Sequence, residues 1–94
     1  MISIINKQIR ILPDVLSQEV SGEVVLLDLN SENYFGLDEI GTRMWQLFKE
    51  HTCLKEVYDI ILEEYDVDGH QLERDLEEII TKLVEAGLVE MSEE

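Results

Sequence analysis

The fold is decided by residues 22–45, GEVVLLDLNSENYFGLDEIGTRMW. Residues 23–29 are rich in Val and Leu and are bounded by turn residues, which predicts a central strand. Residues 30–33 predict a turn, because Asn and Ser hydrogen-bond their own backbone and Asn tolerates a positive φ. Residues 34–37 then return as a short strand, and the chain continues into a helix.

Upstream of this stretch, residues 15–20 are short and alternating, and Ser21-Gly22 supplies a tight turn. The sequence therefore predicts a three-stranded meander. If the strands lie in sequence order, residues 34–37 form an edge of the sheet. Residues 1–13 are left open as either an extra strand or a mobile arm.

Downstream, three helices with one apolar face each are expected. Asp38 is a suitable N-cap for the first and Thr52 for the second. Asp68 and Gln71 resemble a capping box at the start of the third.

The third helix has a clear predicted end. Gly87 is expected at the position after the C-cap, with Leu88 folding back onto Leu83 in a Schellman-type contact. A three-stranded antiparallel sheet followed by three helices is an α+β fold. The helix lengths and short connections suit a winged helix-turn-helix-like packing, and the whole chain, residues 1–94, is expected to form one domain.

Composition and charge exclude several classes of function. Seven basic residues face twenty-two acidic ones, for a net charge of −15, which argues against binding nucleic acid or an anionic membrane. No apolar run resembles a signal peptide or a membrane span. One cysteine excludes an internal disulfide and fits the reducing cytoplasm, where we expect the protein to be located.

A DNA-reading role for the third helix is disfavoured by its charge. A recognition helix needs Arg, Lys, Asn or Gln on its exposed face. The exposed positions of residues 70–86 are instead mainly acidic: Glu73, Arg74, Glu77, Glu78, Thr81 and Glu85.

Metal and catalytic sites are not expected. Residues 64–75 faintly resemble a calcium loop, but its first and last positions carry Glu64 and Asp75 instead of the Asp and bidentate Glu that such a loop needs. His51 and Cys53 are too few for a zinc site, which takes four ligands. No nucleophile–base arrangement or phosphate loop is present. We therefore expect a binding module without a cofactor or enzymatic activity.

The expected edge strand is the feature most suggestive of binding. Tyr34 and Phe35 point to opposite faces of it, and no lysine or proline flanks them to discourage pairing. A groove between this edge and the third helix would accept an extended peptide. Its backbone would supply hydrogen bonds, and its alternate side chains would enter apolar pockets.

Residues 22–45 resemble the peptide-chaperone family of pyrroloquinoline quinone biosynthesis. The shared pattern is an apolar strand, a polar turn, an aromatic-containing strand that ends in Leu, and a helix that opens toward Trp45. The later pattern of residues 67–89 is similar to the end of that family. It comprises Val67-Asp68, Leu72, Asp75-Leu76, Ile79-Ile80, Leu83 and Gly87-Leu88-Val89.

The resemblance implies a recognition element for ribosomally made, post-translationally modified peptides. Such a protein binds the leader of a precursor peptide, as a strand beside the third strand and against the third helix, and presents its core to a maturation enzyme. The contacts that the resemblance implies are Tyr34, Phe35, Gly36, Leu37, Leu72, Asp75, Leu76, Ile79 and Lys82.

The partner enzymes stay open at this point. The chain looks most like the stand-alone members of lasso-peptide pathways, whose partners are a leader peptidase and a macrocyclase. A member that serves a radical enzyme is the alternative. The acidic third helix departs from the family and would suit a basic leader. Outside the family, an acidic winged-helix protein-interaction module or a small subunit of a larger enzyme competes, and the protein is expected to be a monomer or a dimer.

Overall fold

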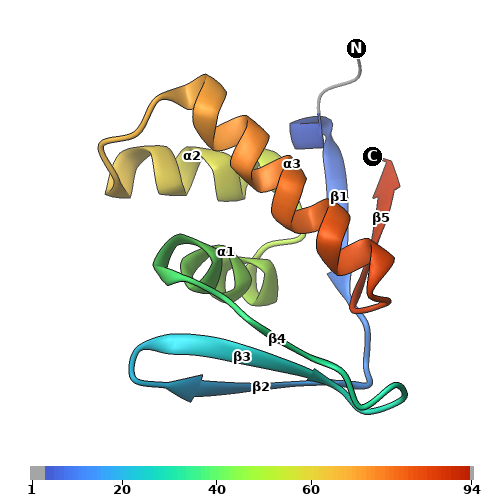
Figure 1. Cartoon of the computed structure of the whole chain (residues 1–94). Coiled ribbons are helices and arrows are strands. Elements are labelled where there is room, and N and C mark those ends of the chain that lie inside the picture. The colour runs from blue at the N-terminus through green and yellow to red at the C-terminus, as the bar shows by residue number, and fades with distance from the viewer. Residues whose placement is uncertain (1–3, 94) are drawn as a thin grey trace.

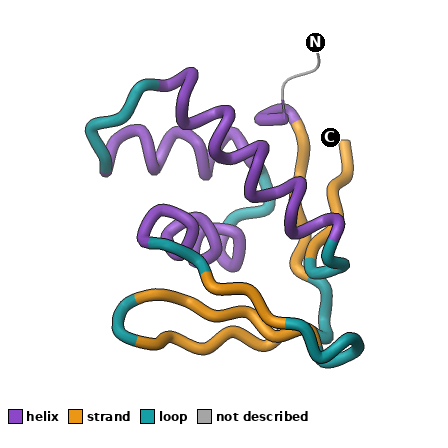
Figure 2. The backbone as a smooth tube through the Cα atoms, viewed as in Figure 1, coloured by secondary structure: helices purple, strands orange, loops and turns teal. Residues whose placement is uncertain are grey.

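The computed structural model describes residues 4–93 and contains the expected meander (Figure 1). Strands β2 (Val15–Val20), β3 (Glu23–Asp28) and β4 (Tyr34–Gly36) form an antiparallel sheet in the order β2-β3-β4. This order confirms the prediction that β3 is central and β4 is an edge. Figure 2 shows this sheet on one side of the helices.

The two turns of the sheet depend on residues with positive φ. Ser21 and Gly22 both have positive φ (54° and 84°), as a two-residue type I′ hairpin requires. In the turn between β3 and β4, Glu32 takes the positive φ (61°), a role that the sequence suggested for an asparagine. Its N–H donates to the carbonyl oxygen of Asp28 at 2.8 Å.

Helices α1 (Glu39–Glu50), α2 (Leu54–Glu64) and α3 (Gly69–Glu85) follow the sheet, which confirms the α+β fold class. Two of the three expected N-caps are present. Asp38 accepts a hydrogen bond from the N–H of Gly41 at 2.8 Å. None of the helices within residues 4–93 is long and apolar enough to cross a bilayer.

The predicted N-cap of α2 was wrong. Cys53 occupies the N-cap position, and its side chain makes no capping hydrogen bond. Thr52 lies one residue too early, because its carbonyl oxygen accepts a hydrogen bond from the N–H of Ile9 at 2.8 Å. This contact attaches the loop between α1 and α2 to the N-terminal part of the chain.

Both ends of α3 follow the local sequence signals. Asp68 caps the helix by accepting hydrogen bonds from the N–H groups of His70 (2.8 Å) and Gln71 (3.2 Å). The Gln71 side chain donates to Asp75 instead of completing the capping box. At the other end, Gly87 has φ 77° and the Leu88 N–H donates to the carbonyl oxygen of Leu83 at 3.0 Å, which confirms the Schellman motif.

Of residues 1–13, which the sequence left open as a strand or an arm, residues 7–11 form a strand, and residues 1–3 lie outside the described part of the chain. β1 (Lys7–Ile11) pairs antiparallel with β5 (Val89–Glu93), and β5 is the strand that the sequence analysis did not predict. Ile9 lies opposite Met91 in this pair, and the segment Ile4–Asn6 before β1 forms a 3₁₀ turn. The two ends of the described chain therefore lie side by side (Figure 1).

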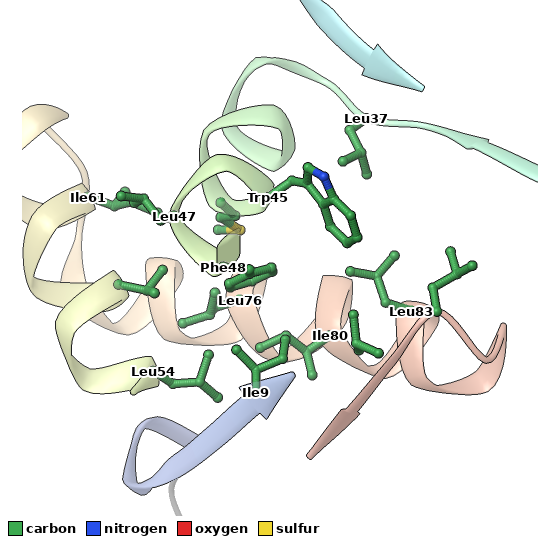
Figure 3. Packing of buried hydrophobic residues seen from close by; sticks show 14 of the residues in the cluster. Ile9, Leu37, Trp45, Leu47, Phe48, Leu54, Ile61, Leu76, Ile80 and Leu83 are labelled. Carbon is green, nitrogen blue, oxygen red and sulfur yellow. The ribbon is translucent and has the colours of Figure 1, made fainter. Parts of the chain in front are cut away.

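The core lies where the three helices meet β1 and the inner face of the meander. Figure 3 shows apolar side chains from the three helices converging with Ile9 of β1 and with Leu37, which follows β4. The largest include Trp45 of α1, Leu26 of β3 and Leu76 of α3, all of which are at most 2% exposed. This core fixes α3 at a set distance from β4, and the candidate site lies between them.

Candidate functional site

An open groove of about 520 Å³ runs between β4, the start of α1 and the second half of α3. Apolar side chains form its floor, and charged side chains stand at its mouth. The lining residues are Phe35, Gly36, Leu37, Asp38, Ile40, Gly41, Met44, Asp75, Glu78, Ile79, Lys82 and Leu83.

The backbone of β4 forms one border of the groove. The Leu37 N–H donates to the Val24 carbonyl oxygen at 2.8 Å, and Phe35 lies opposite Leu26 in the ladder. Because antiparallel pairing alternates, Phe35 and Leu37 direct their backbone groups toward β3. The N–H and C=O groups of Tyr34 and Gly36 therefore face the open edge, where no described strand lies.

Side chains of β4 alternate across the sheet. Phe35 is half-buried and packs against the core, whereas Tyr34 is 74% exposed on the other face. At Gly36, which shares the face of Tyr34, a Cβ atom would meet no atom within 4 Å.

Thr42 of α1 fixes the point where β4 ends. Its buried hydroxyl accepts a hydrogen bond from the N–H of Val24 at 2.9 Å and donates to the carbonyl oxygen of Leu37 at 3.4 Å. The hydroxyl thus stands between two strands that would otherwise continue to pair. Leu37, which lies on the groove floor, is held in place from the helix side.

The α3 wall combines an apolar surface with charged side chains. Ile79 is half-buried and faces the groove, and Leu83 lies deeper. At the mouth, the Lys82 ammonium pairs with Glu78 at 3.2 Å. The Asp75 carboxylate accepts a hydrogen bond from the Gln71 side chain at 2.8 Å. Asp75, Glu78 and Lys82 are all exposed at the mouth of the groove.

The residues that the resemblance implied fall into two groups. Those that line the groove are Phe35, Gly36, Leu37, Asp75, Ile79 and Lys82. The other three lie elsewhere. Tyr34 points to the far face of the sheet, while Leu72 and Leu76 are at most 2% exposed in the core.

The sequence analysis missed the wall that α1 contributes. Asp38, Ile40, Gly41 and Met44 line the groove at the start of this helix. The only sequence signal for this wall is the spacing of Ile40 and Met44, which places them on one face of the helix. It could not show that part of this face is left uncovered beside β4.

Glu64 and Asp68, two carboxylates of the calcium-like stretch, are engaged within the protein. Glu64 accepts two hydrogen bonds from the Arg43 guanidinium, at 2.7 and 2.6 Å, and this pairing lowers the pKa of Glu64 and raises that of Arg43. Hydrogen bonds from the backbone N–H groups of Gln71 and His70 lower the pKa of Asp68. Among residues 4–93, no three side chains of the metal-binding types converge on one point.

Comparison with known proteins gives a consistent result. The family model described as coenzyme PQQ synthesis protein D (PqqD) matches residues 23–89. Two solved structures are similar to this chain. TbiB1 in complex with the TbiA(beta) leader peptide is 41% identical with a TM-score of 0.81, over 86% of this chain and 94% of that one.

The second structure is a lasso peptide synthetase B1 complexed with the leader peptide. It is 26% identical with a TM-score of 0.77, over 88% of this chain and 98% of that one. The search of curated protein sequences gives no significant match.

Proposed function

This chain belongs to the coenzyme PQQ synthesis protein D (PqqD) family, and we propose that it is a non-catalytic protein that binds the leader of a ribosomally made precursor peptide. Two similar solved proteins carry a leader peptide, and their names refer to B1 proteins. The observation that carries the proposal is the open backbone edge of β4 beside an apolar groove.

The leader binds as an added strand on β4. The outward N–H and C=O groups of Tyr34 and Gly36 pair with its backbone and supply affinity that does not depend on sequence. Every second leader side chain then faces α3 and enters the groove beside Ile79, while the others face the side of Tyr34. The apolar floor and the charged mouth supply selectivity.

Phe35, Leu37, Asp75, Ile79 and Lys82 are the side chains that we propose contact the leader, together with the α1 residues of the groove. Leu72 and Leu76 serve this site indirectly, because they anchor α3 in the core. Tyr34 contributes its backbone, and its ring lies on the opposite face.

We propose that the partners are the leader peptidase and the macrocyclase of a lasso-peptide pathway, and that the protein acts in the cytoplasm. The 41% identity to TbiB1 and the second B1 structure favour this pathway. The second candidate is delivery of a precursor to a radical enzyme, which the family description, coenzyme PQQ synthesis, favours.

The test is a chemical-shift titration of the ¹⁵N-labelled protein. The ligands are the TbiA(beta) leader and the leader encoded in the short reading frame nearest to this chain's own gene, with a scrambled peptide as control. We expect shifts at residues 33–37 and along the second half of α3. Shifts confined to the β1–β5 pair, or none with either leader at millimolar concentration, would refute the proposal.

A further inference from the structure

Gly41 occupies the most crowded point of the groove wall. A Cβ atom at this position would lie 3.1 Å from Ile79 Cδ1, 3.2 Å from Asp38 Oδ1 and 3.4 Å from Leu37 Cβ. Carbon atoms in ordinary contact are about 3.5–4.0 Å apart, so a methyl group fits only if a neighbour moves. All three neighbours, like Gly41 itself, line the groove.

Only one of these neighbours moves easily. The Asp38 carboxylate is held by the N–H of Gly41 at 2.8 Å as the N-cap of α1. The Leu37 Cβ is attached to a backbone whose carbonyl oxygen is bonded by the Thr42 hydroxyl and whose N–H is bonded to Val24. The Ile79 Cδ1 atom, in contrast, is the free end of a side chain, and the open space next to it is the groove.

We infer that Gly41 keeps the groove at its full width by leaving room for the Ile79 side chain, so that this pair determines the size of the leader side chain that the groove accepts. The inference rests on the proposed leader binding. It makes Gly41 a positioning residue, which acts on the ligand through Ile79.

The first test uses the protein without a ligand. Spectra of ¹³C-labelled isoleucine δ1 methyl groups are recorded for the wild type and for Gly41→Ala, and Ile79→Val identifies the Ile79 signal by its loss. We expect the Ile79 signal in Gly41→Ala to move because the side chain changes rotamer. An unchanged Ile79 signal in a folded Gly41→Ala protein would overturn the inference.

The second test measures binding of the TbiA(beta) leader, or of the leader from the chain's own locus if that binds more tightly. One methyl group in an apolar pocket changes binding by about tenfold, so Gly41→Ala is expected to weaken affinity by about tenfold. Shortening the obstructing side chain in Gly41→Ala/Ile79→Val should recover most of the loss. The matched control Gly41→Ala/Ile60→Val shortens a half-buried isoleucine of α2 outside the groove and should recover none.

Comparing the single and double variants separates the possible causes of the lost affinity. If Ile79→Val does not improve binding in the Gly41→Ala background, the methyl group acts through the Asp38 cap or the fold, and the inference fails. A second readout is an alanine scan of the apolar positions of the leader. Gly41→Ala should cause no loss of affinity for the one leader variant in which the side chain over Ile79 is shortened to alanine. An equal loss of affinity for all leader variants would contradict a role of Gly41 in selecting side-chain size.

Failure of the proposed function is distinguishable from failure of the inference. If the wild type binds neither leader, the proposed function fails. The methyl spectra still decide whether Gly41 keeps Ile79 out of the groove.

Discussion

Single side chains at the start of α1 control the geometry of the groove. Thr42 stands between β3 and the end of β4, where its hydroxyl satisfies the buried N–H of Val24 and contacts the carbonyl oxygen of Leu37. A buried N–H group without an acceptor destabilises the folded state, because it has lost its hydrogen bond to water. Thr42 is therefore expected to matter for stability and for the position of the groove floor.

Replacing Thr42 with Val tests this role at almost constant volume. The Val24 N–H loses its acceptor, and we expect the free energy of unfolding to fall by about 1–3 kcal/mol in urea titrations. Thr42→Ser keeps the hydroxyl and serves as the control. Wild-type stability of Thr42→Val would show that the hydroxyl contributes nothing.

Asp75 tests whether the groove mouth admits the leader. Arg at this position reverses the charge and extends a long side chain from the rim, so Asp75→Arg should weaken leader binding by about tenfold, or about 1.4 kcal/mol. Glu77→Arg makes a similar charge change on an exposed part of α3 outside the groove. Affinities are measured by calorimetric titration. If both variants lose the same affinity, the effect of Asp75→Arg comes from the overall charge and not from the groove mouth.

At the scale of elements, the two edges of strand β4 differ: one pairs with β3, and the other is open. Phe35 turns its backbone toward β3, whereas Gly36 turns its N–H toward the open edge. Proline lacks this N–H and is tolerated in strands only where that group faces outward. A proline at each position therefore separates stability from binding.

Gly36→Pro removes one hydrogen bond to the added strand, so we expect leader affinity to fall by about 1 kcal/mol, or about fivefold. The melting temperature should stay near that of the wild type. Phe35→Pro breaks the ladder with β3 and should lower the melting temperature clearly. Wild-type affinity in a folded Gly36→Pro variant would exclude strand addition at this edge.

The N-terminus of α3 depends on the charge of Asp68. Its carboxylate accepts two backbone hydrogen bonds, which lower its pKa in the folded state below the ordinary value of about 3.9. A lowered folded pKa stabilises the protein above the unfolded pKa, and this contribution is lost as pH falls through the folded pKa. Stability should therefore become less sensitive to pH when Asp68 no longer titrates.

Asp68→Asn keeps a capping oxygen but removes the charge. We expect the wild type to melt at a higher temperature than the variant at pH 6. The difference should shrink as the pH falls below about 4. Taking this difference cancels the titration of the other carboxylates, and a constant gap between pH 6 and pH 2.5 would contradict a charged cap.

At the scale of the whole molecule, charge and chain ends matter most. Seven basic residues cannot neutralise twenty-two acidic ones, so the folded chain repels itself. The exposed ion pairs Arg10–Glu90, Lys55–Asp59 and Lys82–Glu78 compensate little, because such pairs contribute weakly. Repulsion should dominate the response to salt.

Raising NaCl from about 10 mM to about 0.5 M shortens the Debye length from about 30 Å to less than 10 Å. Because screened repulsion outweighs the screened ion pairs, the melting temperature should rise. Calorimetric scans at constant pH measure the melting temperature at each NaCl concentration. A falling melting temperature would mean that the ion pairs contribute more than the net charge costs.

Features that depend on neighbouring residues could be predicted from the sequence. The Val- and Leu-rich run of β3, the caps at Asp38 and Asp68, and the Schellman end at Gly87 are all encoded within a few positions of the chain. Short-range hydrogen bonds and apolar spacing need no knowledge of the rest of the fold. These signals were sufficient for the meander, the edge position of β4 and the three helices.

Features that depend on distant parts of the chain could not be predicted from local sequence. β5 was missed because its partner β1 lies about 80 residues away, and the cap of α2 was misplaced because Ile9 holds the carbonyl of Thr52. The apolar stripe of α3 gives no sign that Leu76 enters the core while Ile79 faces a groove. That division depends on which neighbours cover each turn of the helix, and periodicity within one helix does not contain this information.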